Sequence, residues 1–173
     1  MGLFGDRPKN SATQPKQAAQ PLPPQLVEYI VTVPYGHPAA VVWDRLDSPT
    51  LALSENQVFG GRVEGSPHGV GEIWVNLRAG SGPRHIHAAE TIESEEGHRR
   101  TWRSLPNYDR GIVSDEWEYT VTPVDAGSCE VRYRSAAEWR IKPEAVPKYT
   151  EIFETEVRSG LEFLSVALDQ ERR

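Results

Sequence analysis

Strand-forming residues, many of them alternating between apolar and polar, fill six stretches in the middle of the chain. Alternation with a period of two is typical of a strand that buries one face. Clusters of Gly, Pro, Asn, Asp and Ser separate the stretches, so the connections are short. Because short connections join antiparallel neighbours, the pattern predicts a meander of six strands. The stretches are QVFGGRVE (57–64), GEIWVNLR (71–78), RHIHAAETIE (84–93), RRTWRSL (99–105), IVSDEWEYTVT (112–122) and CEVRYRSAAEWRI (129–141).

The residues on either side of this meander follow other patterns. LVEYIVTV (26–33) is rich in β-branched and aromatic residues and predicts a further strand that ends before Pro34. Two short helices are predicted next, one in GHPAAVVWDRL (36–46) and one in SPTLALS (48–54), because each stretch has a proline near a first helical position. From about residue 144 to 171, apolar residues recur every three or four positions, which predicts one amphipathic helix roughly 40 Å long.

The length of 173 residues, 38% of them apolar, suits a single globular domain with one core. Residues 1–25 are rich in Pro, Gln, Ala and Lys and have few large apolar side chains. Such a segment cannot bury enough apolar surface to offset its loss of conformational entropy. The sequence therefore predicts a disordered tail over residues 1–25 and one domain over residues 26–173.

Three stretches and the order of the elements resemble a known superfamily. HPAAVVWDRLDSP is similar to the helix that opens its domains, and GVGEIWVNL followed by AAETIESEEGHRRTW is similar to three of its strands. From residue 26 to about 171 the chain resembles the START-like, helix-grip (SRPBCC) superfamily, and its polyketide cyclase/dehydrase-like branch most of all. The resemblance implies an α+β fold in which a curved, seven-stranded antiparallel sheet grips the long C-terminal helix. It also implies a cavity between sheet and helix that holds a hydrophobic small molecule.

Strand alternation selects three side chains that could carry chemistry in that cavity. Glu90, Asp115 and Tyr133 share the parity of the apolar residues of their strands and are expected to face inward. A carboxyl group in an apolar cavity has a raised pKa, which suits general acid or base catalysis. The alternative is that the two carboxylates lie at the rim, solvated or paired with arginines. The residues that set these parities are Ile86, Ala88 and Ile92; Val113, Trp117, Tyr119 and Val121; and Cys129, Val131, Ala137 and Trp139.

Aromatic and polar residues of the inner faces and of the C-terminal helix are candidates for contact with a ligand. Together they could form a wall for a flat or fused-ring molecule, or they could simply fill the core. Arg78 joins this set only if Trp74 and Asn76 face inward, because the parity of their strand is ambiguous. The predicted ligand-binding residues are Trp74, Arg78, Trp102, Trp117, Tyr119, Ser135, Trp139, Tyr149 and Phe153.

His85 and His87 stand two residues apart on a predicted strand, as two ligands of a zinc site can. Their parity is opposite to that of Ile86 and Ala88, so they are expected on the solvent face, with no third ligand beside them. The sequence therefore predicts no metal site and no cofactor, unless a β-bulge near Ala88 reverses the parity. Cys129 is the only cysteine, which excludes an internal disulfide, and we expect it to be a buried apolar side chain.

Charge and composition limit the classes of partner. Lys and Arg total 19 against 25 Asp and Glu, a formal net charge of −6, and no basic stripe suited to nucleic acid is present. No stretch approaches the roughly 20 apolar residues of a membrane-spanning helix, and the N-terminal residues lack the apolar core of a secretory signal. We expect a cytoplasmic protein that partners a hydrophobic small molecule, without nucleic acid or membrane insertion. Its oligomeric state stays open.

Three functions fit these expectations. The first is an enzyme that holds a reactive chain in a folded conformation and catalyses an aldol-type cyclisation or dehydration, with one acid or base group to move protons. The second is a carrier or sensor that binds a lipid-like ligand in the same cavity without chemistry. The third is a domain without a ligand that acts through protein contacts, its interior filled by Trp117, Trp139 and Phe153.

Overall fold

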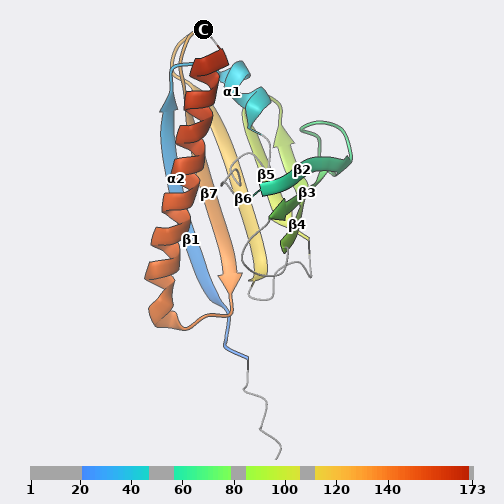
Figure 1. Ribbon diagram of the computed structural model, residues 1–173, viewed down its shortest axis with the longest axis vertical. Coiled ribbons are helices and arrows are strands. Elements are labelled where there is room, and N and C mark those ends of the chain that lie inside the picture. Colours follow the sequence, from blue (N-terminus) through green and yellow to red (C-terminus); the bar gives the residue numbers. More distant parts are fainter. Residues whose placement is uncertain (1–20, 47–56, 79–84, 106–111, 172–173) are drawn as a thin grey trace, which may run out of the picture.

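The computed structural model describes residues 21–46, 57–78, 85–105 and 112–171, with the backbone alone for 57–60, 76–78 and 85–87. In these ranges the chain forms one antiparallel sheet in the order β1-β7-β6-β5-β4-β3-β2 and two α-helices (Figure 1). The predicted α+β fold with a curved seven-stranded sheet and a long C-terminal helix is confirmed. The elements are β1 (Gln25–Tyr35), α1 (Ala39–Arg45), β2 (Gln57–Glu64), β3 (Ile73–Arg78), β4 (His85–Glu95), β5 (Arg99–Ser104), β6 (Ile112–Pro123), β7 (Cys129–Trp139), the 3-10 helix η2 (Pro143–Ala145) and α2 (Val146–Glu171).

The first strand and the first helix differ slightly from their predictions. β1 continues through Pro34 to Tyr35, although proline lacks an N–H group. β1 is an edge strand with β7 as its single neighbour, so it tolerates one residue that cannot donate. α1 begins at Ala39, and Pro38 is the residue before it rather than its first residue. The second short helix was predicted over residues 48–54, which lie outside the described ranges.

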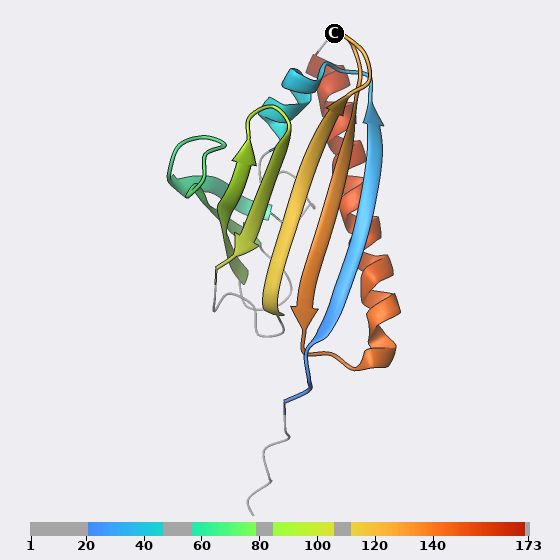
Figure 2. The same ribbon diagram turned by 180° about the vertical axis from the view of Figure 1, so that it is seen from behind.

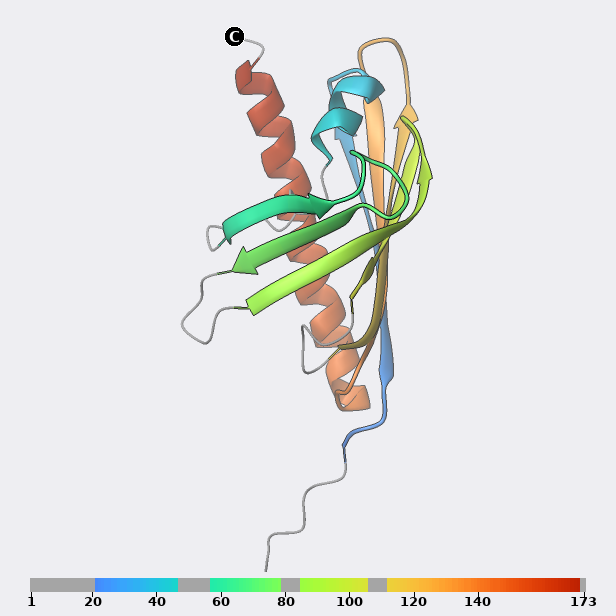
Figure 3. The same ribbon diagram turned by 90° about the vertical axis from the view of Figure 1, so that its right-hand side faces the viewer.

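The sheet bends strongly around the long helix. β2, β3 and β4 turn away from the plane of β1, β7 and β6, while α2 packs against β1 (Figure 3). Seen from the opposite side, neither described helix covers the convex face of the sheet (Figure 2). Register shifts interrupt the ladders of β2, β4 and β6, and such bulges increase the local bend and twist.

The core lies between the concave face of the sheet and one stripe of α2. Gly160, Leu161, Leu164 and Leu168 are buried, and they recur at the helical spacing that the sequence predicted. The Tyr35 hydroxyl donates to the Leu161 carbonyl oxygen at 2.6 Å, which ties the end of β1 to the middle of α2. Burial of each such leucine contributes about 1.5–3 kcal/mol, so this stripe is what holds the helix on the sheet. None of the described helices is long and apolar enough to cross a membrane.

The predicted inner faces of β6 and β7 are correct except at one residue. Trp117 and Tyr119 of β6 are buried, and so are the inward residues of β7 from Cys129 to Ala137. Val113, predicted to share this face, is 44% exposed. The register shifts between Ile112 and Ser114, so Val113 is the extra residue of a bulge and leaves the alternation.

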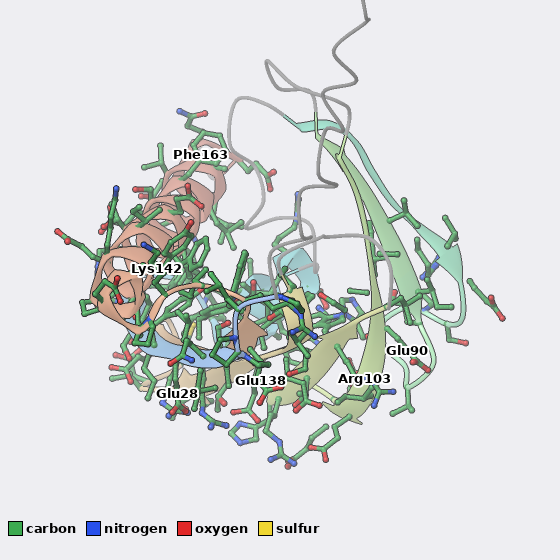
Figure 4. All side chains as sticks on the ribbon, turned by 90° about the horizontal axis from the view of Figure 1, so that it is seen from below. Glu28, Glu90, Arg103, Glu138, Lys142 and Phe163 are labelled. Atoms are coloured by element: carbon green, nitrogen blue, oxygen red, sulfur yellow. The ribbon has the colours of Figure 1, made fainter. Side chains whose placement is uncertain are left out.

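The predicted inner face of β4 is wrong, and Glu90 faces outward. Thr91 pairs with the fully buried Trp102, so the inner face holds Thr91 rather than its neighbour Glu90. Glu90 pairs instead with Arg103, and their side chains form an ion pair at 3.5 Å on the convex face (Figure 4). The parity argument failed because Ile92, which helped to set it, is the extra residue of a second bulge, between Thr91 and Glu93.

The convex face carries a network of opposite charges. Glu28, Glu138, Arg103 and Glu90 follow this face from β1 to β4 (Figure 4). Arg134 donates to Glu28 at 2.6 Å, and further pairs cross the neighbouring strands. Exposed pairs of this kind each contribute about 0–1 kcal/mol, because water screens them. The convex face is therefore a solvated surface.

Candidate functional site

Four polar side chains from three neighbouring strands meet on the concave face. The register places Tyr29 of β1 opposite Ser135 of β7, and Asp115 of β6 opposite Ala137. The ring centroids of Tyr29 and Tyr133 lie 5.8 Å apart, and the hydroxyl groups of Tyr133 and Ser135 act on the Tyr29 phenol, whose pKa they lower. The structure therefore brings Asp115 and Tyr133, two of the predicted catalytic residues, together with Ser135.

The environment of this cluster keeps its two phenols protonated. Burial raises the pKa of Tyr133 well above 10.0, and the nearby Tyr29, Tyr119 and Asp115 raise it further. The pKa of Tyr29 is also raised, mainly by burial and partly by the charge of Asp115. Both phenols are therefore hydrogen-bond donors at neutral pH rather than bases.

Asp115 can accept protons or hydrogen bonds from this position. The Ser104 hydroxyl on β5 donates to its Oδ2 at 3.0 Å. The side chain is half-buried, so it keeps some contact with solvent. Asp115 is held by a hydrogen bond from a neighbouring strand and lies next to protonated phenols. The site therefore has a hydrogen-bond acceptor and hydrogen-bond donors side by side.

Half-buried aromatic rings adjoin these polar groups. Trp139 of β7 lies 5.2 Å from Phe153 and 6.0 Å from Tyr149, and Phe153 lies 6.3 Å from Tyr29 between ring centroids. All four side chains are half-buried, and they come from β1, β7 and the first turns of α2. We name Tyr29, Trp139, Tyr149 and Phe153 the ring cluster. Their remaining exposure makes them available to a ligand.

The deeper predicted ligand-binding residues belong to the core. Trp102, Trp117 and Tyr119 are buried, and Trp102 packs edge-on against Tyr119 at 5.1 Å. Trp74 pairs with Ala89 and is half-buried, and its Nε1 has no hydrogen-bond partner among the described residues. The side chain of Arg78 lies outside the described ones.

Tyr29 was missed by the sequence interpretation although its pattern was readable. In LVEYIVTV it shares the parity of Val27 and Val31, both of which are buried on the concave face. The same alternation that selected Tyr133 would have selected Tyr29.

A second missed feature is a buried arginine on the concave side of β5. Arg100 is 0% exposed, and its guanidinium carbon lies 5.3 Å from the Trp43 ring centroid and 4.3 Å from that of Trp102. Its guanidinium forms an ion pair with the buried Glu72 at 3.5 Å. It also donates to the Leu46 carbonyl oxygen and to Nδ1 of His68. This group joins α1 and the β2–β3 connection to the sheet, and its role is structural.

The prediction that no metal is bound stays a prediction. Among the side chains that the structure describes, no three His, Cys, Asp or Glu lie together as metal ligands would. The side chains of His85 and His87 are not among them. The parity argument that placed both on the solvent face does not hold for β4, because its inner face is that of Ala89 and Thr91.

Cys129 is expected to be inert in the folded protein. It is 1% exposed, and burial raises the pKa of its thiol from 9.0 to about 11. At about pH 8 the native chain therefore holds about a hundredfold less thiolate than the unfolded chain, and thiolate is the reactive form. We expect iodoacetamide to alkylate the native protein at least about a hundredfold more slowly than the denatured protein, as followed by mass spectrometry. Similar rates in the two states would contradict the burial of this thiol.

The sequence matches no protein-family model, and no curated protein matches it significantly. Solved structures do match. Norcoclaurine synthase from Thalictrum flavum, in complex with dopamine and hydroxybenzaldehyde, superposes with a TM-score of 0.62 at 16% identity, over 87% of this chain and 90% of that one. A START superfamily protein from Mycobacterium smegmatis gives 0.65 at 10% identity, over 82% and 98%.

A third structure is the di-domain ARO/CYC protein BexL from a biosynthetic pathway. It gives a TM-score of 0.63 at 17% identity, over 82% of this chain. The match spans 46% of the length of BexL. Identities this low relate folds rather than activities. With the sheet order and the position of α2, these likenesses show that the chain has the START-like helix-grip fold.

Proposed function

We propose that the protein binds a hydrophobic, aromatic or polyketide-like small molecule between the sheet and α2, against the ring cluster. The observation that carries this proposal is the position of the ring cluster next to Asp115 and the hydroxyls of Tyr133 and Ser135. Half-buried rings supply apolar contact, and a few converging polar groups fix the orientation of a ligand. The structural likeness to norcoclaurine synthase, which was solved in complex with dopamine and hydroxybenzaldehyde, supports an aromatic ligand.

The same arrangement suits an aldol-type cyclisation followed by dehydration. In this mechanism Asp115 removes a proton from the carbon next to a ligand carbonyl, and Tyr133 or Tyr29 donates a hydrogen bond to the enolate oxygen. The enolate carbon forms a bond to a second carbonyl carbon, and the alkoxide takes the proton back. Loss of a further proton and of the hydroxyl group then releases water. The likeness to the ARO/CYC protein BexL favours this reaction class.

The binding step is tested by calorimetric titration of the full chain with naphthol, a flat aromatic probe. The double variant Trp139→Ala, Phe153→Ala removes two rings of the cluster, and we expect its affinity for naphthol to fall at least about tenfold. Phe163→Ala is the matched control, because Phe163 is 57% exposed and points away from the sheet (Figure 4). Equal affinities of the parent and of the folded double variant would place the ligand elsewhere.

Native mass spectrometry of freshly purified protein distinguishes an enzyme from a ligand carrier without catalytic activity. A compound that co-purifies is identified, returned to the protein and analysed after incubation. An enzyme of the proposed class releases a product that has lost water, and Asp115→Asn keeps the binding but stops this conversion. A compound recovered unchanged with both proteins would support the carrier and contradict the catalytic step.

A further inference from the structure

We propose that Thr91 of β4 and Trp102 of β5 bind a second oxygen of the ligand, so that the site selects a fused-ring molecule with an acceptor oxygen at each end. The inference rests on the proposed function, because it narrows the class of molecule that the same site accepts. The first oxygen is the one that faces Tyr133 in the proposed reaction. The second lies across the ring system, at two buried hydrogen-bond donors.

Thr91 and Trp102 face each other across neighbouring strands on the concave side. The register pairs them directly, so their side chains share a face and their Cβ atoms lie about 4.5–5.5 Å apart. Both residues are 0% exposed. Neither the Thr91 hydroxyl nor the Trp102 Nε1 has a hydrogen-bond partner among the described residues. Two buried donors on one face can converge on a single oxygen, because a carbonyl oxygen has two lone pairs.

The nearest buried carboxylate does not serve as the acceptor for this pair. The backbone N–H of Thr91 donates to the carbonyl oxygen of Glu72 at 2.8 Å, which places Glu72 beside it. The Glu72 carboxylate, however, accepts the backbone N–H of His68 at 3.1 Å and pairs with Arg100 at 3.5 Å. A buried donor without an acceptor has lost its hydration and gained nothing in return, so the free protein is destabilised here. A bound molecule that supplies the acceptor explains why such donors are present.

The donor pair lies close to Asp115 along the strands. Ser104 stands two positions after Trp102 on the same face of β5, and its hydroxyl donates to Asp115 at 3.0 Å. Trp102 also packs against Trp117 with 6.4 Å between ring centroids, and Trp117 stands two positions after Asp115 on β6. Two positions along a strand span about 7 Å. A fused-ring molecule that contacts Asp115 is therefore long enough to present an oxygen on its far side to the donor pair.

The ligand has to displace some of the side chains that cover the donor pair, because both residues are closed to solvent in the free protein. Trp74 on β3 lies on the same face, opposite Ala89, and is half-buried, so this wall is not sealed at β3. The Nε1 of Trp74 also has no hydrogen-bond partner among the described residues. A ligand that satisfies these donors binds the open form more strongly than the closed form and therefore favours opening.

The test uses two probes that differ in the second oxygen alone. Acetylnaphthol, with its acetyl group at the end opposite the hydroxyl, has a carbonyl oxygen where isopropenylnaphthol has a methylene group. Calorimetric titration of the full chain is expected to show at least about tenfold tighter binding of acetylnaphthol. In the proton–nitrogen correlation spectrum, the indole N–H signal of Trp102 is expected to move downfield with acetylnaphthol and not with isopropenylnaphthol. This signal is identified by its absence in Trp102→Phe.

Thr91→Val removes the hydroxyl and keeps the shape of the side chain. We expect the preference for acetylnaphthol to fall to less than about threefold in this variant. The melting temperature of the free variant should not fall, because the change removes a buried polar group that lacks a partner. Thr101→Val is the matched control, because Thr101 lies on the opposite face of β5 and its hydroxyl donates to Glu118 at 3.5 Å. It should leave the preference unchanged.

The outcomes separate this inference from the proposed function. Equal binding of the two probes to the parent protein, an unmoved Trp102 signal or an unchanged preference in folded Thr91→Val overturns the inference and leaves the aromatic site standing. A lower melting temperature of Thr91→Val would show that the hydroxyl already has a partner, such as a buried water, which also overturns it. Binding of neither probe would overturn the proposed function, and the inference with it.

Discussion

Replacing Arg100 by methionine is expected to lower the free energy of unfolding by about 3–5 kcal/mol. Methionine keeps much of the apolar contact with Trp43 and Trp102 but removes the charge. Glu72, which is 1% exposed, would then keep a buried negative charge, with Arg62 at 3.7 Å as its remaining ion-pair partner among the described residues. A buried charge that loses its buried partner costs more than the pair contributes, because the partly exposed Arg62 offsets its lost hydration less well than Arg100 does.

Urea unfolding followed by circular dichroism measures this loss, and two further variants identify its cause. Arg103→Met on the same strand removes an exposed cation that pairs with Glu90, and it should change stability by about 0–1 kcal/mol. The double variant Arg100→Met, Glu72→Gln removes both buried charges and should recover most of the loss. A single Arg100→Met variant within about 1 kcal/mol of the parent would show that the buried pair does not hold α1 and the β2–β3 connection in place.

Replacing Leu161 by alanine is expected to cost about 2–5 kcal/mol. Leu161 is 0% exposed in the middle of α2, where its backbone carbonyl also accepts the Tyr35 hydroxyl. The smaller side chain leaves a cavity that a hydrogen-bonded sheet cannot easily close by moving inward. Phe163→Ala, two residues further on, is the matched control and should stay within about 0.5 kcal/mol of the parent, because Phe163 is exposed. Equal losses in the two variants would mean that α2 does not dock through the stripe of Leu161.

Much of the fold could be read from the sequence because its patterns are local. The alternation in CEVRYRSAAEW predicts the buried face of β7, and the register with β1 is regular along that strand. The period of α2 predicts its buried leucines in the same way. Where a strand is regular, residues two apart in the sequence lie on the same face of the sheet. The inward faces of Asp115, Tyr133 and Ser135 were therefore predicted correctly.

The errors arose where the ladder is irregular or the contact is long-range. Glu90 was placed inward because Ile92 looked like an inner residue, yet Ile92 is the extra residue of a bulge. Bulges leave no reliable mark in a single sequence, and one extra residue reverses the assignment of every residue beyond it. The burial of Arg100 could not be predicted either, because its partners Glu72 and Leu46 come from other parts of the sequence.

The sheet order has a consequence for the order of events during synthesis. β1 is the first strand made, and its one neighbour, β7, is the last, so Gln25 pairs with Trp139. The segment between them contains every other strand. β1 can pair with β7 only after β7 has left the ribosome. Pairing across such a separation is slow, and until it happens the apolar side of β1 faces water. The nascent chain therefore passes through a long interval in which its first strand is a site for chaperones or for aggregation.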